Sequence, residues 1–138
     1  MTTSVTELPY NRLLGLEPAA DRPALQLPAG PQYLNHLGTV HAGALLSLAE
    51  AASGEFLLAH FVGSDGLIPV VRRMEAKFRK PAQGAVTAAA SLSPKALAEL
   101  DAELAARGRA LVTVAVAVHD AAGTHALSAE VEWFIQKR

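Results

Sequence analysis

The chain has 138 residues, of which 51% are apolar and only 18% charged, so it is long and apolar enough for one domain with a hydrophobic core. Its formal net charge of −1 argues against nucleic acid as a partner, because no basic stripe is available to follow phosphates. The absence of cysteine excludes disulfides, a thiolate nucleophile and cysteine-ligated metals. The N-terminal segment lacks the basic and apolar regions of a signal peptide. We expect a single cytoplasmic domain over residues 1–138.

The N-terminal part of the chain predicts short elements. A helix is expected over residues 6–15, and a strand over residues 24–27 is all that the surrounding prolines allow. The apolar anchors of that first helix are expected to be Leu8, Leu13 and Leu14.

A polar, glycine-containing loop over residues 35–41 then leads into a long apolar helix over residues 42–61. Apolar side chains recur at three- and four-residue steps on one face of this helix, as a core-facing helix requires. They are Leu45, Leu46, Ala49 and Ala52. Its charge, length and high alanine content argue against a membrane span.

The second half of the chain predicts four strands with a helix inserted after the second. The strands are expected over residues 67–79, 85–92, 109–118 and 125–136, and the helix over residues 94–107. Ser93 and Pro94 are typical of a helix start and Gly108 of a helix end. Turns are expected at residues 63–66 and 120–123, and the strand over 109–118 is apolar on both faces, as in a sheet centre. This order predicts an α+β fold, an antiparallel sheet wrapped around one long helix.

Glu50 is the only ionisable residue between Ala42 and Ala52. A charge close to the apolar face of a helix is costly unless it is paired, hydrogen-bonded or used. Burial would also raise its pKa towards the range in which a carboxylate acts as a base near neutral pH. The alternative is a structural acid that pairs with an arginine across a subunit interface.

Two segments of the sequence resemble those of a known family. Asn35-His-Leu-Gly-Thr-Val-His41-Ala-Gly43, followed by Leu-Ala-Glu50, resembles the active-site segment of hotdog-fold thioesterases of the phenylacetic-acid-degradation (PaaI) type, in particular the DUF4442 branch. Phe78-Arg-Lys-Pro81-Ala-Gln-Gly84 resembles the family's aromatic-x-x-Pro-Ala-x-Gly segment. The resemblance implies a hotdog fold and hydrolysis of an acyl-coenzyme A thioester, with no metal or redox cofactor. It also implies a homodimer or a dimer of dimers, with the site completed across a subunit interface.

The resemblance gives catalytic roles to four residues. Glu50 would be the general base or the nucleophile, and Asn35 would hold the water or the thioester oxygen. Gly43 lies at the helix start, where free backbone N–H groups could form an oxyanion hole, and His41 could polarise the carbonyl. Each has a structural alternative: a turn residue for Asn35, close helix packing for Gly43, and a hydrogen bond within the loop for His41.

Basic residues around the third expected strand could meet the coenzyme A phosphates, and we expect this of Arg72, Arg79 and Lys80. A solvated strand face is the alternative.

Two other functions stay open. One is a non-catalytic acyl or acyl-coenzyme A binding module, favoured because Pro69-Val70-Val71 carries no hydroxyl where some relatives have one. The other is a hotdog hydratase or dehydratase, whose different loop before the helix is not found.

Overall fold

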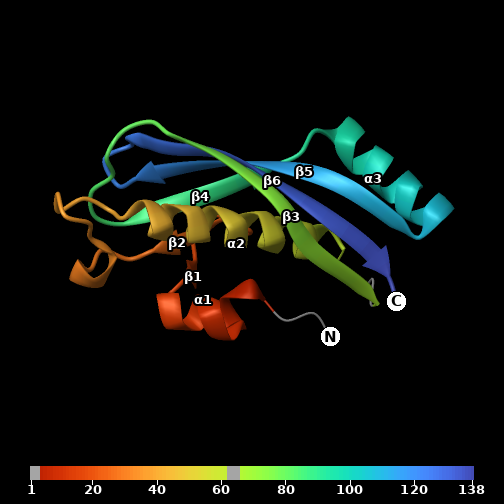
Figure 1. Ribbon diagram of the computed structural model, residues 1–138, viewed down its shortest axis with the longest axis horizontal. Helices are drawn as coiled ribbons and strands as arrows, with labels where there is room; N and C mark the ends of the chain where they lie inside the picture. Colours follow the sequence, from red (N-terminus) through yellow and green to blue (C-terminus); the bar gives the residue numbers. More distant parts are fainter. Residues whose placement is uncertain (1–3, 62–65) are drawn as a thin grey trace.

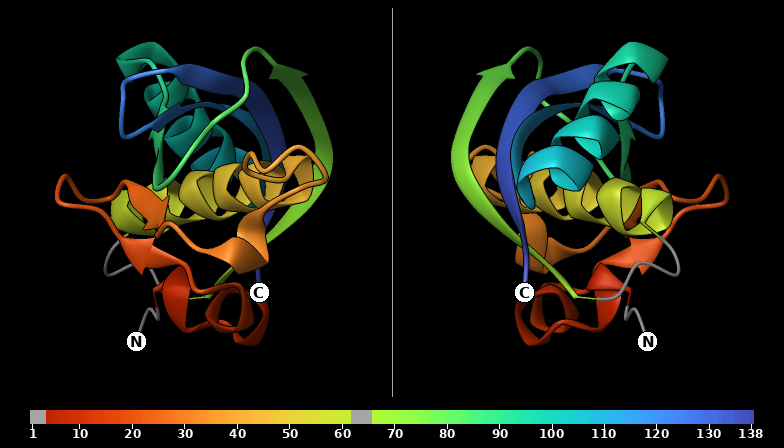
Figure 2. Two further views of the ribbon diagram at one scale, coloured as in Figure 1. Left: turned by 90° about the vertical axis from the view of Figure 1, so that its left-hand side faces the viewer. Right: turned by 90° about the vertical axis from the view of Figure 1, so that its right-hand side faces the viewer.

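The computed structural model describes residues 4–61 and 66–138. An antiparallel sheet in the strand order β1-β2-β4-β5-β6-β3 wraps around one long helix, α2 (Ala42–His60), as Figures 1 and 2 show. The strands are β1 (Glu17–Pro18), β2 (Leu25–Leu27), β3 (Leu67–Phe78), β4 (Val86–Ser91), β5 (Arg109–Asp120) and β6 (His125–Lys137). The predicted α+β architecture is confirmed. The short strand β1 was not predicted, and most of the turn expected at residues 63–66 lies outside the described residues.

Helix α2 is the centre of the core. Its small residues bring it close to the sheet: Leu45, Ala49 and Ala52, three of the four residues predicted to face the core, are at most 3% exposed. By length and composition the helix could cross a membrane, so the length argument made from the sequence was wrong. Half of it is nevertheless buried inside the fold, as in the core helix of a globular domain.

The inner face of β6, a strand predicted over residues 125–136, completes the core. The alternating residues Leu127, Ala129, Val131, Trp133 and Ile135 are all buried. The indole Nε1–H of Trp133 donates to the hydroxyl of Ser53 on α2 at 2.9 Å. Its ring lies against Gly54, where a Cβ atom would be 3.4 Å from the nearest ring carbons. This close approach fixes α2 against the sheet one turn beyond Glu50.

Helix α3 (Pro94–Arg107) has the predicted ends. The Ser93 hydroxyl accepts the backbone N–H of Ala96, and Gly108 ends the helix with a positive φ of 71°. The helix packs beside the first half of β5, beyond the residues that pair with β4. Strand β5 lies between β4 and β6, so its predicted place inside the sheet is confirmed. Its outward face is nevertheless exposed over most of its length within one chain.

Strand β3 forms an edge of the sheet and pairs on one side only, with β6. Most of its residues are exposed on both faces, and Phe78 is 50% exposed. The register shifts between Val71 and Arg73, which places a bulge in the strand.

The N-terminal helix was predicted too long. A 3₁₀ turn, η1 (Val5–Glu7), precedes a short helix, α1 (Pro9–Leu14), because a proline suits a helix start better than a helix interior. Two of the expected anchors, Leu8 and Leu13, are 48% and 85% exposed, so that part of the prediction was wrong. A second unpredicted 3₁₀ turn, η2 (Pro31–Tyr33), follows β2.

Candidate active site

Glu50 is half-buried in the middle of α2. Burial raises the pKa of its carboxyl group above the ordinary value, because water solvates the charged form less well there. Among residues 4–61 and 66–138, no side chain or backbone group makes a hydrogen bond or ion pair with this carboxylate. A desolvated acid with free acceptor oxygens is chemically suited to accept a proton.

The side chain of Asn35 organises the loop before α2. Its oxygen accepts the backbone N–H groups of Leu37 at 2.9 Å and Thr39 at 3.1 Å, and its amide donates to the Thr39 hydroxyl at 2.9 Å. These bonds are those of the turn residue that the sequence left open as an alternative. A role in holding water or substrate stays a prediction.

His41 and Gly43 interact directly at the start of α2. His41 is the N-cap, and its Nδ1 accepts the backbone N–H of Gly43 at 2.8 Å. The N–H groups of Ala44 and Leu45 bind the His41 carbonyl. In the first turn this leaves the N–H of Ala42 without a partner among the described residues. The donor expected from Gly43 is therefore occupied in this structure, which the sequence did not indicate.

The Pro81–Gly84 turn lies against the same loop. The backbone N–H of Val40 donates to the Ala82 carbonyl at 2.9 Å, and that of Gln83 donates to the Asp120 carboxylate at 3.1 Å. The bond from Gln83, with further bonds from Thr124 and Ala122, lowers the pKa of Asp120 below its ordinary value. The β5–β6 hairpin thus holds the turn, and the turn holds the loop that leads to His41.

The three basic residues expected to meet phosphates are not brought together. Arg79 and Lys80 lie next to the Pro81 turn, where the Arg79 Nε–H donates to the Ser128 hydroxyl at 2.7 Å. Arg72 lies at the β3 bulge, about 25 Å from Lys80 along an extended chain. Its guanidinium carbon is 5.9 Å from the centre of the Phe134 ring.

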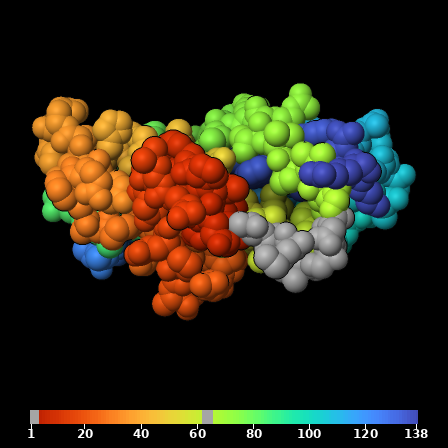
Figure 3. Space-filling view, turned by 90° about the horizontal axis from the view of Figure 1, so that it is seen from below, coloured from red at the N-terminus to blue at the C-terminus, as the bar shows by residue number. Residues whose placement is uncertain are grey.

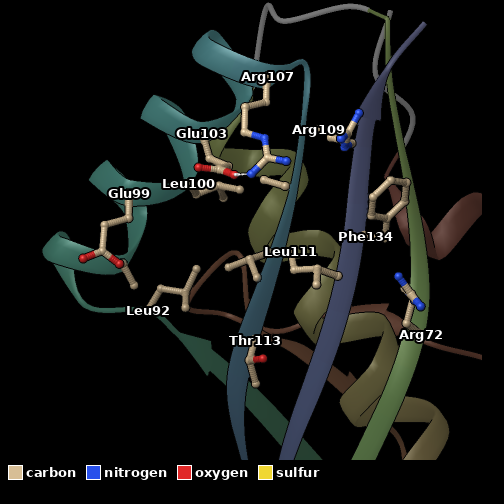
Figure 4. A pocket seen from close by; sticks show the side chains of 13 residues that line it. Arg72, Leu92, Glu99, Leu100, Glu103, Arg107, Arg109, Leu111, Thr113 and Phe134 are labelled. Carbon is tan, nitrogen blue, oxygen red and sulfur yellow. Dashed lines mark hydrogen bonds and ion pairs between the residues drawn. The ribbon is translucent and has the colours of Figure 1, made fainter.

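Arg72 instead lines a hollow of about 520 Å³ between α3 and the outer face of the sheet. Figure 4 shows Phe134 and Leu111 at its floor and Arg107 turned towards Glu103 on α3. Glu50 is not among the residues that line this hollow. It is thus separate from the Glu50 site. No group of three potential metal ligands occurs among the described residues.

Sequence reasoning missed the N-terminal segment as part of the Glu50 surroundings. The phenol oxygen of Tyr10 lies 3.0 Å from the Ser47 hydroxyl on α2, and Ser4 donates to Glu55 at 2.7 Å. These contacts join residues 37 and 51 positions apart, so no local pattern could have indicated them.

A family model described as "Domain of unknown function (DUF4442)" matches residues 12–135. The chain belongs to the DUF4442 family. Among solved structures, a probable thioesterase of unknown function from Pseudomonas aeruginosa is 26% identical to this DUF4442 protein, with a TM-score of 0.83, and the match covers 97% of this chain and 91% of that one. Comparison with curated protein sequences gives no match.

Two further structures show the same fold at lower identity. A Bacillus halodurans protein solved with coenzyme A is 21% identical, with a TM-score of 0.71 and coverage of 98% of this chain and 77% of that one. A protein from Chlorobaculum tepidum is 21% identical, with a TM-score of 0.81 and coverage of 96% and 88%. With the sheet wrapped around α2, these likenesses confirm the hotdog fold of this DUF4442 member.

Proposed function

We propose that this protein is an acyl-coenzyme A thioesterase that hydrolyses an acyl thioester to the free acid and coenzyme A. The observation that carries the proposal is Glu50, a half-buried carboxylate with a raised pKa and no partner among the described residues. Two similarities support it, one to the probable thioesterase from Pseudomonas aeruginosa and one to the Bacillus halodurans protein solved with coenzyme A.

In the proposed reaction Glu50 removes a proton from water, and the water oxygen bonds to the thioester carbonyl carbon. The carbonyl oxygen becomes an oxyanion. When the carbonyl reforms, the carbon–sulfur bond breaks and its electron pair leaves with the coenzyme A thiolate. In direct attack, a Glu50 oxygen would instead bond to the carbonyl carbon and the carbon–sulfur bond would break, releasing the coenzyme A thiolate. Water would then hydrolyse the resulting mixed anhydride to the free acid and the Glu50 carboxylate.

The start of α2 would stabilise the oxyanion. The N–H of Ala42 has no partner in residues 4–61 and 66–138, and that of Gly43 becomes free if the His41 imidazole turns away. One such donor typically contributes about 3 kcal/mol to transition-state stabilisation. Coenzyme A enters as part of the substrate, with Arg79 and Lys80 as candidates to bind its phosphates.

The proposal includes a homodimer or a dimer of dimers. In the part of the chain that the structure describes, β3 pairs with β6 alone and is exposed on both faces, which leaves its outer edge available to a second copy. Light scattering after size-exclusion chromatography tests this, and a monomeric, active protein would contradict it.

The proposed function is tested by thiol release from a panel of acyl-coenzyme A thioesters of different chain length and aromatic content. Glu50→Ala should lower kcat at least about a hundredfold, the usual effect of losing a general base. Glu99→Gln, an exposed acid on α3, is the matched control and should leave kcat unchanged. Equal oligomeric state and melting temperature are required of every variant. If the wild type releases no thiol, or if Glu50→Ala matches it, the thioesterase proposal is wrong.

One observation favours a second candidate, a non-catalytic acyl-coenzyme A binding module. The Gly43 N–H is bound by His41, so this expected oxyanion donor is not available without a side-chain movement. Tight binding of an acyl-coenzyme A in calorimetry without any release of thiol would support this function over hydrolysis.

A further inference from the structure

Two hydroxyl groups from distant parts of the chain meet one helical turn before Glu50. The Tyr10 phenol in α1 lies 3.0 Å from Ser47 Oγ in α2. Ser47 precedes Glu50 by three residues, a spacing that brings side chains on a helix surface to about 5–6 Å at their Cβ atoms. The pair is partly open to solvent, since Tyr10 is 60% exposed.

The N-terminal segment is held along α2 on both sides of Glu50. Tyr10 binds at Ser47, one turn before it, and Val5 lies against Gly54, one turn after it. Ser4 adds a bond to Glu55 at 2.7 Å. In Figure 3, α2 is visible at the floor of a hollow between the N-terminal segment and β3. The Tyr10–Ser47 pair thus lies on α2 one turn before the acid.

The Tyr10–Ser47 hydrogen bond leaves one hydroxyl hydrogen available for another partner. A phenol is a stronger acid than an aliphatic alcohol, so the Tyr10 O–H is the better donor and Ser47 Oγ the acceptor. Ser47 then keeps its own hydrogen for a further bond. The Glu50 carboxylate has acceptor oxygens without a partner among the described residues. A water molecule between them would accept from Ser47 and donate to Glu50.

We propose that Ser47, oriented by Tyr10, holds the water that Glu50 activates. Ser47 keeps its proton throughout, while the water gives one proton to Glu50 and its oxygen to the thioester carbonyl carbon. Tyr10 is a positioning residue that acts only through Ser47. The inference rests on the proposed function and supplies a hydroxyl that Pro69, Val70 and Val71 do not carry.

The test compares thiol release by the wild type, four variants at Ser47 and Tyr10, and one control variant on one acyl-coenzyme A substrate. Ser47→Ala should lower kcat about tenfold with little change in KM, the rate equivalent of one lost hydrogen bond of about 1.4 kcal/mol. Tyr10→Phe should lower kcat less, and the double variant should match Ser47→Ala, because Tyr10 acts through Ser47. Ser47→Thr retains the hydroxyl and should restore most of kcat.

Ser4→Ala is the matched control, because it removes another bond between the same segment and α2 but leaves the hydroxyls beside Glu50 in place. It should leave kcat unchanged. A fall in kcat as large as that of Ser47→Ala would show that both bonds only anchor the segment, and would overturn the inference. An active wild type with the same kcat as Ser47→Ala would also overturn the inference, while the thioesterase proposal would remain intact. If the fold-decreases in kcat of Tyr10→Phe and Ser47→Ala multiply in the double variant, Tyr10 does not act through Ser47 and its proposed role is wrong. A wild type that releases no thiol overturns both proposals together.

Discussion

Replacing Ser53 by alanine should lower the free energy of unfolding by about 2 kcal/mol. The Ser53 hydroxyl is fully buried, accepts the Trp133 indole N–H at 2.9 Å and donates to the Glu50 carbonyl oxygen at 2.7 Å. Its removal leaves the indole N–H without an acceptor in a site where Trp133 is only 8% exposed. An unsatisfied buried donor costs about 1–3 kcal/mol. The Glu50 carbonyl belongs to the helix, so the loss of its second donor adds little.

The expected change in melting temperature follows from the length of the chain. At about 2.1 cal/mol/K per residue, 138 residues give an unfolding entropy of about 0.29 kcal/mol/K. A loss of about 2 kcal/mol therefore corresponds to a melting temperature about 7 °C lower.

Thermal and urea unfolding of Ser53→Ala, Trp133→Phe and the double variant measure the effect. Phenylalanine has no N–H, so the double variant should lose less stability than the two single losses added together. Ser91→Ala, at the exposed end of β4, is the control and should be close to neutral. A Ser53→Ala variant within about 0.5 kcal/mol of wild type, or strict additivity, would refute the reasoning.

Three other variants test the remaining physical claims. Glu50→Gln should raise the melting temperature at pH 7. Because the folded-state pKa of Glu50 is raised, the protein loses stability as pH rises from the ordinary value of 4.5 through that pKa, and glutamine avoids this loss. Melting curves from about pH 4 to 8 should show the gain vanish at the acid end, and a lower melting temperature at pH 7 would contradict the expectation. Asp120→Asn should speed amide hydrogen exchange at Gln83, Thr124 and Ala122, whose N–H groups bind the Asp120 carboxylate. The lowered pKa means that these bonds stabilise the fold above the ordinary Asp pKa and that this stability is lost as pH falls through the folded-state pKa. Unchanged exchange rates by NMR would contradict this stabilising role. Gly54→Ala should raise the free energy of unfolding by about 1 kcal/mol, because alanine is the better helix former. Its Cβ atom would lie 3.4 Å from the Trp133 ring, which is an ordinary van der Waals contact. Urea unfolding measures the change, and a destabilised variant would show that the contact is too tight.

The elements that sequence predicted well carry strong local signals. Helix α3 has a serine N-cap, a proline at its first position and a glycine at its end, and both of its bounds are confirmed. Strand β6 alternates apolar and polar residues, and it begins at the predicted residue and ends one residue beyond the predicted end. Such signals operate within a few residues, so no knowledge of the rest of the fold is needed.

The predictions are wrong or incomplete where contacts with a distant part of the chain determine whether a residue is buried. A strand such as β3 has the same local pattern at a sheet edge as at its centre, so its exposure could not be predicted. Leu8 and Leu13 have the composition of core residues, but Val5 and Leu16 are the ones that pack inside. In the candidate site the loop and Glu50 were predicted, whereas the Tyr10–Ser47 contact depends on the folded arrangement of two helices.

The exposed charges of β3 have a further consequence, for solubility. A strand of 12 residues with a free edge can template pairing with any other extended chain, which is a common start of aggregation. Arg73, Glu75 and Lys77 stand on this edge strand and make such pairing costly for partners that do not match their pattern. Their replacement by threonine or valine would favour the strand conformation locally, and should still yield a protein that precipitates more readily. The same charges therefore select among the chains that can approach the sheet.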